Sequence, residues 1–172
     1  ANRLAQYRSN RDDLNIKVVL LEDIYEEFSS GKQDISAIRN FVKYVYDNAI
    51  NASSRLKYVC LFGDASIDYK DRISGNNNIV PTYESTASFS TGSSAFASDD
   101  FYGMMDPQEG NLNSVTGLLD IAVGRILADT PSMARNAVDK IIAYESRESF
   151  GPWRNNFVLI SDDADESGSG GY

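Results

Sequence analysis

Residues 34–63 read DISAIRNFVKYVYDNAINASSRLKYVCLFG, and this stretch decides the fold class. Within residues 34–50 the apolar side chains recur at intervals of three and four, which places them on one face of a helix. They are Ile35, Ile38, Phe41, Val42, Val45, Tyr46 and Ala49. Asp34 is expected to cap the start of this helix. Residues 58–63, YVCLFG, form a short apolar run that predicts a buried strand.

A second apolar run precedes the helix. Residues 16–21 read IKVVLL and predict another buried strand, and a short helix is expected from there to Phe28. A helix between two such strands forms a βαβ unit, because parallel neighbours need a long crossover connection. The sheet is therefore expected to be parallel in this part of the chain.

The rest of the chain continues the alternation of helices and strands. Residues 119–126, LDIAVGRI, alternate in polarity and predict a strand. Thr130 is expected to cap a following helix, with a proline at the first helical position. Residues 157–160 predict a last strand, and residues 2–11 the end of a helix. This order predicts an α/β domain of three layers, with a mostly parallel sheet flanked by helices.

One long stretch, residues 65–118, shows no helical or strand period. It contains three consecutive asparagines and a Ser/Thr-rich run at residues 85–98. Irregular segments of this length are uncommon inside compact domains and are usually functional or disordered. We therefore expect one domain over residues 1–172 with a long irregular loop at its middle.

The composition excludes several classes of function. The 172 residues are 42% hydrophobic and 24% charged, which is typical of a globular chain. The net charge of −9 disfavours nucleic acid as a partner, because affinity for phosphates comes from basic groups. There is no His and only one Cys, so the chain cannot by itself hold a Cys–His pair, a His metal site or an internal disulfide. No apolar run approaches the roughly 18 residues of a membrane span.

Acidic residues follow three of the predicted strands. They are Glu22-Asp23, Asp64 and Asp162-Asp163. Ligands of open parallel sheets bind outside the carboxyl ends of the strands, so these acids are candidates for one shared site. For Glu22 and Asp23 the alternative is a helix start, where acids interact with free amides and the helix dipole. That alternative is weaker for Asp64, because no helix follows it.

A second group of acids lies in and beside the irregular stretch. Its members are Asp99, Asp100, Asp106, Glu109 and Asp120. Residues 106–111, DPQEGN, form an oxygen-rich turn, and calcium takes roughly six to eight oxygen ligands. With no His and one Cys, calcium or magnesium is the metal class that the composition favours. The alternative is an ordinary polar turn with solvated acids, since no EF-hand pattern is present.

Cys60 lies in the middle of the strand predicted at residues 58–63. A free cysteine at such a position is typically a small buried hydrophobic side chain. We therefore predict that Cys60 is buried and has no catalytic role.

Several short motifs together resemble the gingipain family of cysteine peptidases. They are IYEEFSSGKQD (24–34), LFGD (61–64), SDDFYG (98–103), DIAVGR (120–125), DKIIAYE (139–145) and WRN (153–155). Their order and spacing, rather than any single motif, carry the resemblance, which covers nearly the whole chain. Within this family the chain resembles the sortases of the type IX secretion system.

The resemblance implies a caspase-like fold of two adjacent subdomains, of which residues 1–172 would be the first. The family's catalytic His and Cys would then follow residue 172, in agreement with the absence of His. Cys60 does not occupy the family's nucleophile position. The chain also begins at Ala1 without a Met, so we expect it to be a piece of a larger protein.

The resemblance also implies site residues. Gingipains bind calcium between a Gly-Asp pair after a strand and the loop that leads to a Gly-Arg strand. The matching acids are Asp64, Asp106 or Glu109, and Asp120. The family further places an acid after the last strand, where it orients the catalytic His. Asp163 is the predicted acid, with Asp162 and Asp165 as its neighbours in the same loop.

The resemblance finally implies an activity. The protein would act at the cell surface, on the outer membrane of a Gram-negative bacterium, removing C-terminal sorting domains from secreted cargo. It would then pass the cargo to water or to surface lipopolysaccharide. Its thiolate would attack the scissile carbonyl while a His protonates the leaving amine. This chain would supply scaffold, calcium site and cleft wall, and would be inactive alone.

The expected partners are cargo proteins, the second half of the peptidase domain and other outer-membrane secretion components. No nucleic acid is expected among them. The alternative, from a different class of function, is a non-enzymatic surface module that is stabilised by calcium and only docks other proteins.

Overall fold

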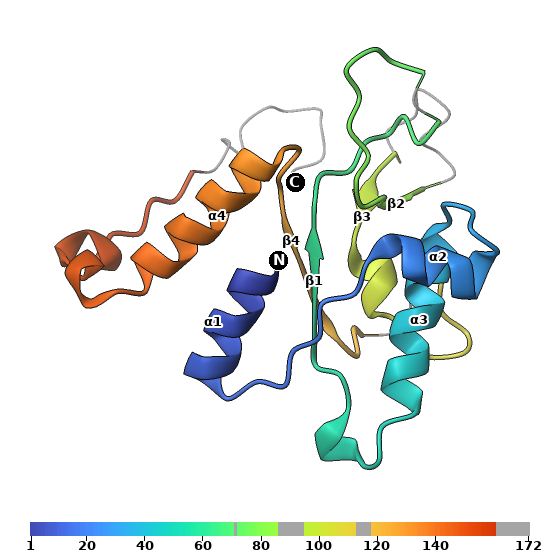
Figure 1. Ribbon diagram of the computed structural model, residues 1–172, viewed down its shortest axis with the longest axis horizontal. Coiled ribbons are helices and arrows are strands. Elements are labelled where there is room, and N and C mark those ends of the chain that lie inside the picture. The colour runs from blue at the N-terminus through green and yellow to red at the C-terminus, as the bar shows by residue number, and fades with distance from the viewer. Residues whose placement is uncertain (71, 86–94, 113–117, 161–172) are drawn as a thin grey trace, which may run out of the picture.

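The computed structural model describes residues 1–70, 72–85, 95–112 and 118–160 (Figure 1). Its α-helices are α1 (Asn2–Asp12), α2 (Leu21–Ser29), α3 (Ile35–Asp47) and α4 (Pro131–Tyr144). Its strands are β1 (Tyr58–Phe62), β2 (Tyr83–Glu84), β3 (Ala97–Ser98) and β4 (Ala122–Ile126). Its short 3₁₀ helices are η1 (Ala52–Ser54), η3 (Asp100–Gly103), η5 (Arg147–Ser149) and η6 (Pro152–Asn155).

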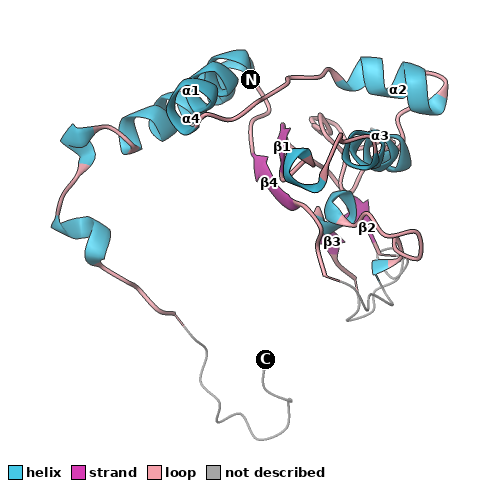
Figure 2. Ribbon diagram, turned by 90° about the horizontal axis from the view of Figure 1, so that it is seen from below, coloured by secondary structure: helices cyan, strands magenta, loops and turns pink. Residues whose placement is uncertain are grey.

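Strands β1 and β4 form a central parallel pair. Tyr58 lies opposite Ala122 at one end, and Phe62 lies opposite Ile126 at the other. Helices α2 and α3 lie on one side of this pair, and α1 and α4 lie on the other (Figures 1 and 2). The predicted α/β architecture, a parallel sheet between helices, is confirmed. Strands β2 and β3 form a separate antiparallel pair within the stretch predicted to be irregular.

The main core lies between β1, α2, α3 and η3. Its buried members are Ile24, Ala37, Ile38, Leu61, Val80, Phe101 and Tyr102. The rings of Phe28 and Phe41 extend it in an edge-to-face contact, with centroids 5.9 Å apart. Burial of this apolar surface is the main favourable contribution to folding, and it fixes α3 against β1.

The caps predicted for the two longest helices are confirmed. The Asp34 carboxylate accepts a hydrogen bond from the Ser36 amide at 2.7 Å. The Thr130 hydroxyl accepts one from the Met133 amide at 3.2 Å, and Pro131 occupies the first position of α4. These side chains satisfy amides that have no partner within the helix.

Two predicted strands are wrong. Residues 16–20 are extended but belong to neither sheet, and Leu21 begins α2 instead of ending a strand. Helix formation buries Ile24 and places two acids in the first turn, where the helix dipole favours them. Residues 157–160 are also outside both sheets, with side chains 81–93% exposed. An apolar run forms a strand only where another strand lies beside it. The sequence of the run does not show whether such a neighbour exists.

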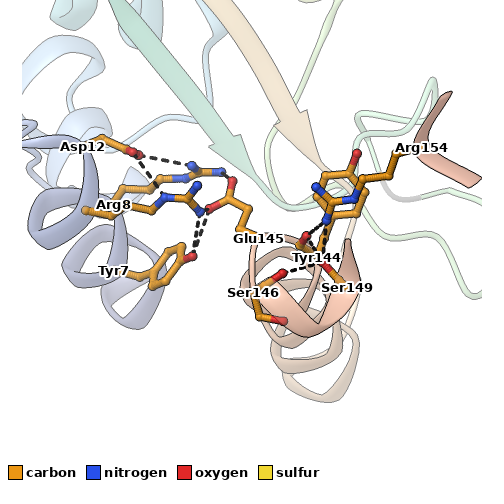
Figure 3. A network of polar contacts seen from close by, with 9 residues as sticks. Tyr7, Arg8, Asp12, Tyr144, Glu145, Ser146, Ser149 and Arg154 are labelled. Carbon is orange, nitrogen blue, oxygen red and sulfur yellow. Dashed lines mark hydrogen bonds and ion pairs between the residues drawn. The ribbon is translucent and has the colours of Figure 1, made fainter. Parts of the chain in front are cut away.

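A cluster of charges joins α1 and α4 (Figure 3). Glu145, the residue after α4, accepts a hydrogen bond from the Tyr7 hydroxyl at 3.0 Å. Its carboxylate also forms ion pairs with Arg8, at 2.7 Å, and with Arg11. Three side chains of α1 therefore converge on one carboxylate and hold α1 beside α4.

Candidate functional site

The carboxyl ends of β1 and β4 lie side by side, and the chain turns sharply after β1. The Gly63 amide donates to the Ile126 carbonyl at 3.0 Å and extends the parallel pairing. Gly63 has φ 148°, which residues with a side chain rarely adopt, and a Cβ here would lie 2.6 Å from Cγ2 of Ile79. Open α/β sheets bind their ligands at this edge, so it is the candidate functional site.

Arg125 of β4 connects the segments at this edge. Its guanidinium donates two hydrogen bonds to the Asp99 carboxylate, from Nε to Oδ2 at 2.8 Å and from Nη2 to Oδ1 at 2.6 Å. Nη1 donates to the carbonyls of Gly63, at 2.8 Å, and Val80, at 2.6 Å. Nη2 also reaches the Pro81 carbonyl at 3.3 Å. All three guanidinium nitrogens are engaged, so Arg125 holds the site together and is not a free ligand-binding cation.

Two further contacts complete this hub. The Thr82 hydroxyl donates to Oδ1 of Asp99 at 2.9 Å, and the Tyr102 hydroxyl donates to the Pro81 carbonyl at 2.5 Å. Tyr102 is fully buried, and this burial raises the pKa of its hydroxyl well above the ordinary value. The hydroxyl therefore stays protonated and keeps its role as a donor.

A hollow of about 400 Å³ opens beside the hub. Its described lining consists of Ala65, Ser66, Ile67, Thr82, Glu84, Ala95, Phe96, Ala97 and Arg125. Desolvation raises the pKa of the Glu84 carboxyl. Hydroxyl, carboxyl and apolar groups thus meet in a concave surface at the strand ends.

Asp64 lies at the same edge, directly after Gly63. Its backbone carbonyl accepts from the amides of Ile79 and Val80, each at 3.0 Å. Its Oδ1 atom is buried and has no hydrogen-bond partner within the described residues. A buried carboxylate oxygen without a partner is unfavourable, so this atom is a candidate acceptor for a donor or a cation from outside the described residues.

The other predicted calcium ligands lie at the opposite edge, near the start of β4. Oε2 of Glu109 accepts a hydrogen bond from the Asp106 amide at 3.0 Å. Oδ2 of Asp120 accepts one from the Met105 amide at 2.9 Å. These carboxylates therefore bind backbone amides of the segment that follows η3.

The structure does not bring the four predicted calcium ligands together. Asp64 follows β1, whereas Asp120 precedes β4, and the two strands run parallel in register. The paired residues alone span four steps of about 3.3 Å, so the two acids are separated by more than roughly 13 Å. Ligand oxygens lie about 2.3–2.6 Å from calcium, so one ion cannot contact both. Within the described residues, no three acidic or Cys side chains are grouped to hold a metal ion.

Comparison with known proteins agrees with this architecture. The model of peptidase family C25 matches residues 1–170 of the chain. The chain belongs to peptidase family C25. The resemblance to the gingipains inferred from the short motifs is thereby confirmed.

A solved structure of a C25 relative is also similar. It is the dimeric latent PorU from Porphyromonas gingivalis, with a TM-score of 0.65 and 30% sequence identity. The similarity covers 91% of this chain and 15% of the PorU chain. No curated protein matches the chain.

Within this C25 chain, Cys60 is exposed, and the prediction that it is buried is wrong. Its neighbours Val59 and Leu61 face the core, so Cys60 points to the opposite side of β1, where the helices leave it accessible. Partial desolvation nevertheless raises the pKa of its thiol, which lowers the thiolate fraction at neutral pH. A raised pKa is unfavourable for a nucleophile, because the thiolate is the reactive form.

The predicted orienting acid, Asp163, lies outside the described residues, as do Asp162 and Asp165. The Arg125–Asp99 pair, in contrast, is a feature that our reading of the sequence missed. In the sequence, Asp99 stands among acids that are candidate cation ligands, and the Gly-Arg pair stands within a family motif. The available signal was an arginine inside an otherwise apolar strand, because a buried guanidinium is usually paired with an acid.

Proposed function

We propose that this chain is part of a sortase-type cysteine peptidase, which removes C-terminal sorting domains from secreted proteins and attaches the cargo to surface lipopolysaccharide. The observation that carries this proposal is the 30% identity to PorU over 91% of the chain. The match to family C25 over residues 1–170 supports the peptidase class. Because the chain spans only 15% of PorU, the complete reaction is proposed for the full-length protein.

The chemistry requires groups from outside this chain, since the chain contains no His. A cysteine thiolate attacks the scissile carbonyl, the peptide C–N bond breaks, and a His delivers its proton to the leaving amine. Water or an amine of lipopolysaccharide then attacks the thioester and releases the thiol. Asp163 is proposed to orient the His through its second ring N–H.

The contribution of this chain is one wall of the cleft. The Arg125–Asp99 pair joins β4 to the segments around Gly63 and Pro81, which carry part of the hollow at the strand ends. A wall held by a buried charged pair keeps its geometry when a peptide binds. Catalytic groups elsewhere therefore meet the scissile bond at a fixed position.

For the calcium implied by the family, we propose Asp64 as the ligand from this chain. The support is its buried Oδ1 atom, which lacks a partner within the described residues. The other ligands would come from outside the described residues. Asp106, Glu109 and Asp120 are not included, because they lie at the opposite edge of the strand pair.

The proposed location is the bacterial cell surface, at the outer membrane, with cargo, the second half of the peptidase domain and secretion components as partners. The support for this location is the family resemblance alone. Among the described helices, none has the length and apolar character needed to cross a bilayer.

The test is cleavage of a secreted cargo protein with its C-terminal sorting domain by the full-length protein, followed by mass spectrometry. We expect release of the sorting domain by the wild type and equally by Cys60→Ala. Loss of cleavage in a folded Cys60→Ala variant would contradict the assignment of the nucleophile to another segment. Binding of cargo without any cleavage would instead favour the non-enzymatic docking module.

A further inference from the structure

A group of backbone carbonyls in the turn before β4 points toward α3. Arg39 of α3 donates from Nε to the Met104 carbonyl at 2.9 Å. Its Nη2 reaches the carbonyls of Asp106, at 3.4 Å, and Glu109, at 3.2 Å. Lys43, one helical turn further along α3, donates to the Met105 carbonyl. Two positive side chains thus donate hydrogen bonds to four backbone carbonyls of residues 104–109. We call residues 104–109 the carbonyl turn.

Two carboxylates in and beside the carbonyl turn, those of Glu109 and Asp120, have their own partners. Oε2 of Glu109 accepts from the Asp106 amide, and Oδ2 of Asp120 accepts from the Met105 amide. These two carboxylates therefore bind backbone amides, while the carbonyls of the turn accept hydrogen bonds from the Arg39 guanidinium. The Arg39 guanidinium also lies 5.6 Å from the centre of the Phe101 ring, which favours a cation at this place.

We infer that Arg39 is the resident cation of the carbonyl turn and that the turn is built without a bound metal ion. Arg39 and Lys43 together carry two positive charges, the same charge as calcium. An additional calcium ion at these carbonyls would have to displace the guanidinium and would lie beside two like charges. This inference is independent of the proposed peptidase function and of the calcium proposed at Asp64.

The carbonyl turn sets the start of β4, so Arg39 is a positioning residue. The Gly103 carbonyl, just before the turn, accepts from the amides of Asp120 and Ile121 at 3.0 and 3.3 Å. Ile121 packs with Met105 and with Val42 of α3 in one buried cluster. The link from α3 through the carbonyl turn therefore fixes the strand whose other end carries the Arg125 hub.

The experiment compares thermal unfolding of full-length variants in millimolar calcium and in EDTA. Arg39→Met keeps the aliphatic stem and removes the charge, Arg39→Lys keeps a charge, and Arg135→Met is an exposed control on α4. We expect Arg39→Met to lower Tm by several degrees in both buffers, Arg39→Lys to recover part of that loss, and Arg135→Met to have little effect. Equal Tm for Arg39→Met and Arg39→Lys would overturn the role of the charge.

A double variant, Asp106→Asn with Glu109→Gln, tests the absence of a metal ion in the same turn. The amide oxygen of Gln still accepts the hydrogen bond that Glu109 receives, while both negative charges that a calcium ion needs are gone. We expect the shift in Tm between calcium and EDTA to be the same in this variant and in the wild type. A calcium-dependent shift that disappears only in the double variant would show that an ion holds the turn, and the inference would be wrong.

Discussion

The two ends of the central strand pair are each held by an arginine, but the arginines have different partners. At the carboxyl end, the Arg125 side chain is 10% exposed and is paired with the Asp99 carboxylate. At the amino end, Arg39 is half-buried and donates to backbone carbonyls. Removal of Arg125 leaves the Asp99 carboxylate, which is only 24% exposed, without its cation, whereas removal of Arg39 leaves only neutral carbonyls. The carboxyl end should therefore be the more sensitive to loss of its arginine.

The largest expected effect is that of Arg125→Met. Removing one partner of a largely buried ion pair costs up to about 3–5 kcal/mol, because the remaining charge stays uncompensated. The free energy of unfolding, measured by urea titration of the full-length protein, should fall by that amount. Arg39→Met should lose less, about 1–3 kcal/mol, since its acceptors are neutral.

Adding Asp99→Asn separates the charge effect from packing. In the double variant with Arg125→Met the uncompensated charge is gone, so the total loss should be smaller than the sum of the two single losses. If the loss in the double variant equals the sum of the two single losses, the uncompensated charge is not the cause. The two ends of the strand pair would then not differ in the way proposed.

Calcium is the second point of comparison between the ends. If the Asp64 carboxylate binds calcium in the folded protein, an excess of about a hundredfold over Kd stabilises the protein by roughly 2.7 kcal/mol. Calorimetry should show this rise in the wild type and in Asp120→Asn, and not in Asp64→Asn. A response that is lost in Asp120→Asn instead would place the ion at the amino end.

Glycines at both ends are expected to have intermediate effects. A Cβ at Gly63 would lie 2.6 Å from the Ile79 side chain, and one at Gly103 would lie 2.7 Å from the Ile121 carbonyl. Overpacking of this kind costs about 1–3 kcal/mol. Alanine at either position should lower the free energy of unfolding by that amount. Gly124→Ala is the control, because a Cβ there has no atom within 4 Å among those described, and a similar loss in Gly124→Ala would show that steric contact is not the cause.

The smallest expected effect concerns Glu84 in the hollow. Burial raises the pKa of its carboxyl in the folded state, so its ionisation opposes folding. The protein has the full stability of the protonated Glu84 at pH values below the ordinary Glu pKa. It loses part of this stability as the pH rises through the raised pKa of Glu84 in the folded state. Glu84→Gln should therefore be slightly more stable than the wild type at pH 7, and this advantage should vanish at low pH. Urea titrations at low pH and at pH 7 measure the difference in stability between Glu84→Gln and the wild type. A difference of equal size at both pH values would show that it comes from packing and not from ionisation.

Much of the fold was predictable because its signals are local. The spacing of apolar residues in α3, the caps at Asp34 and Thr130, and the apolar run of β1 depend only on neighbours a few residues away. The family motifs were also readable, since their order along the chain is preserved. Residues 16–21 and 157–160 failed as strands for the opposite reason, because an apolar run does not say whether a second strand lies beside it.

By itself, the sequence determined the α/β class, the family and the absence of a Cys–His pair within the chain. Only the tertiary structure decided what the acids do. Asp99 pairs with Arg125, which is 26 residues away, Asp64 and Asp120 lie at opposite ends of one parallel pair, and the carbonyl turn holds a guanidinium. The physical reason is that an acid takes the nearest donor or cation in space. That neighbour is set by strand register and helix packing, which join residues that are distant along the chain.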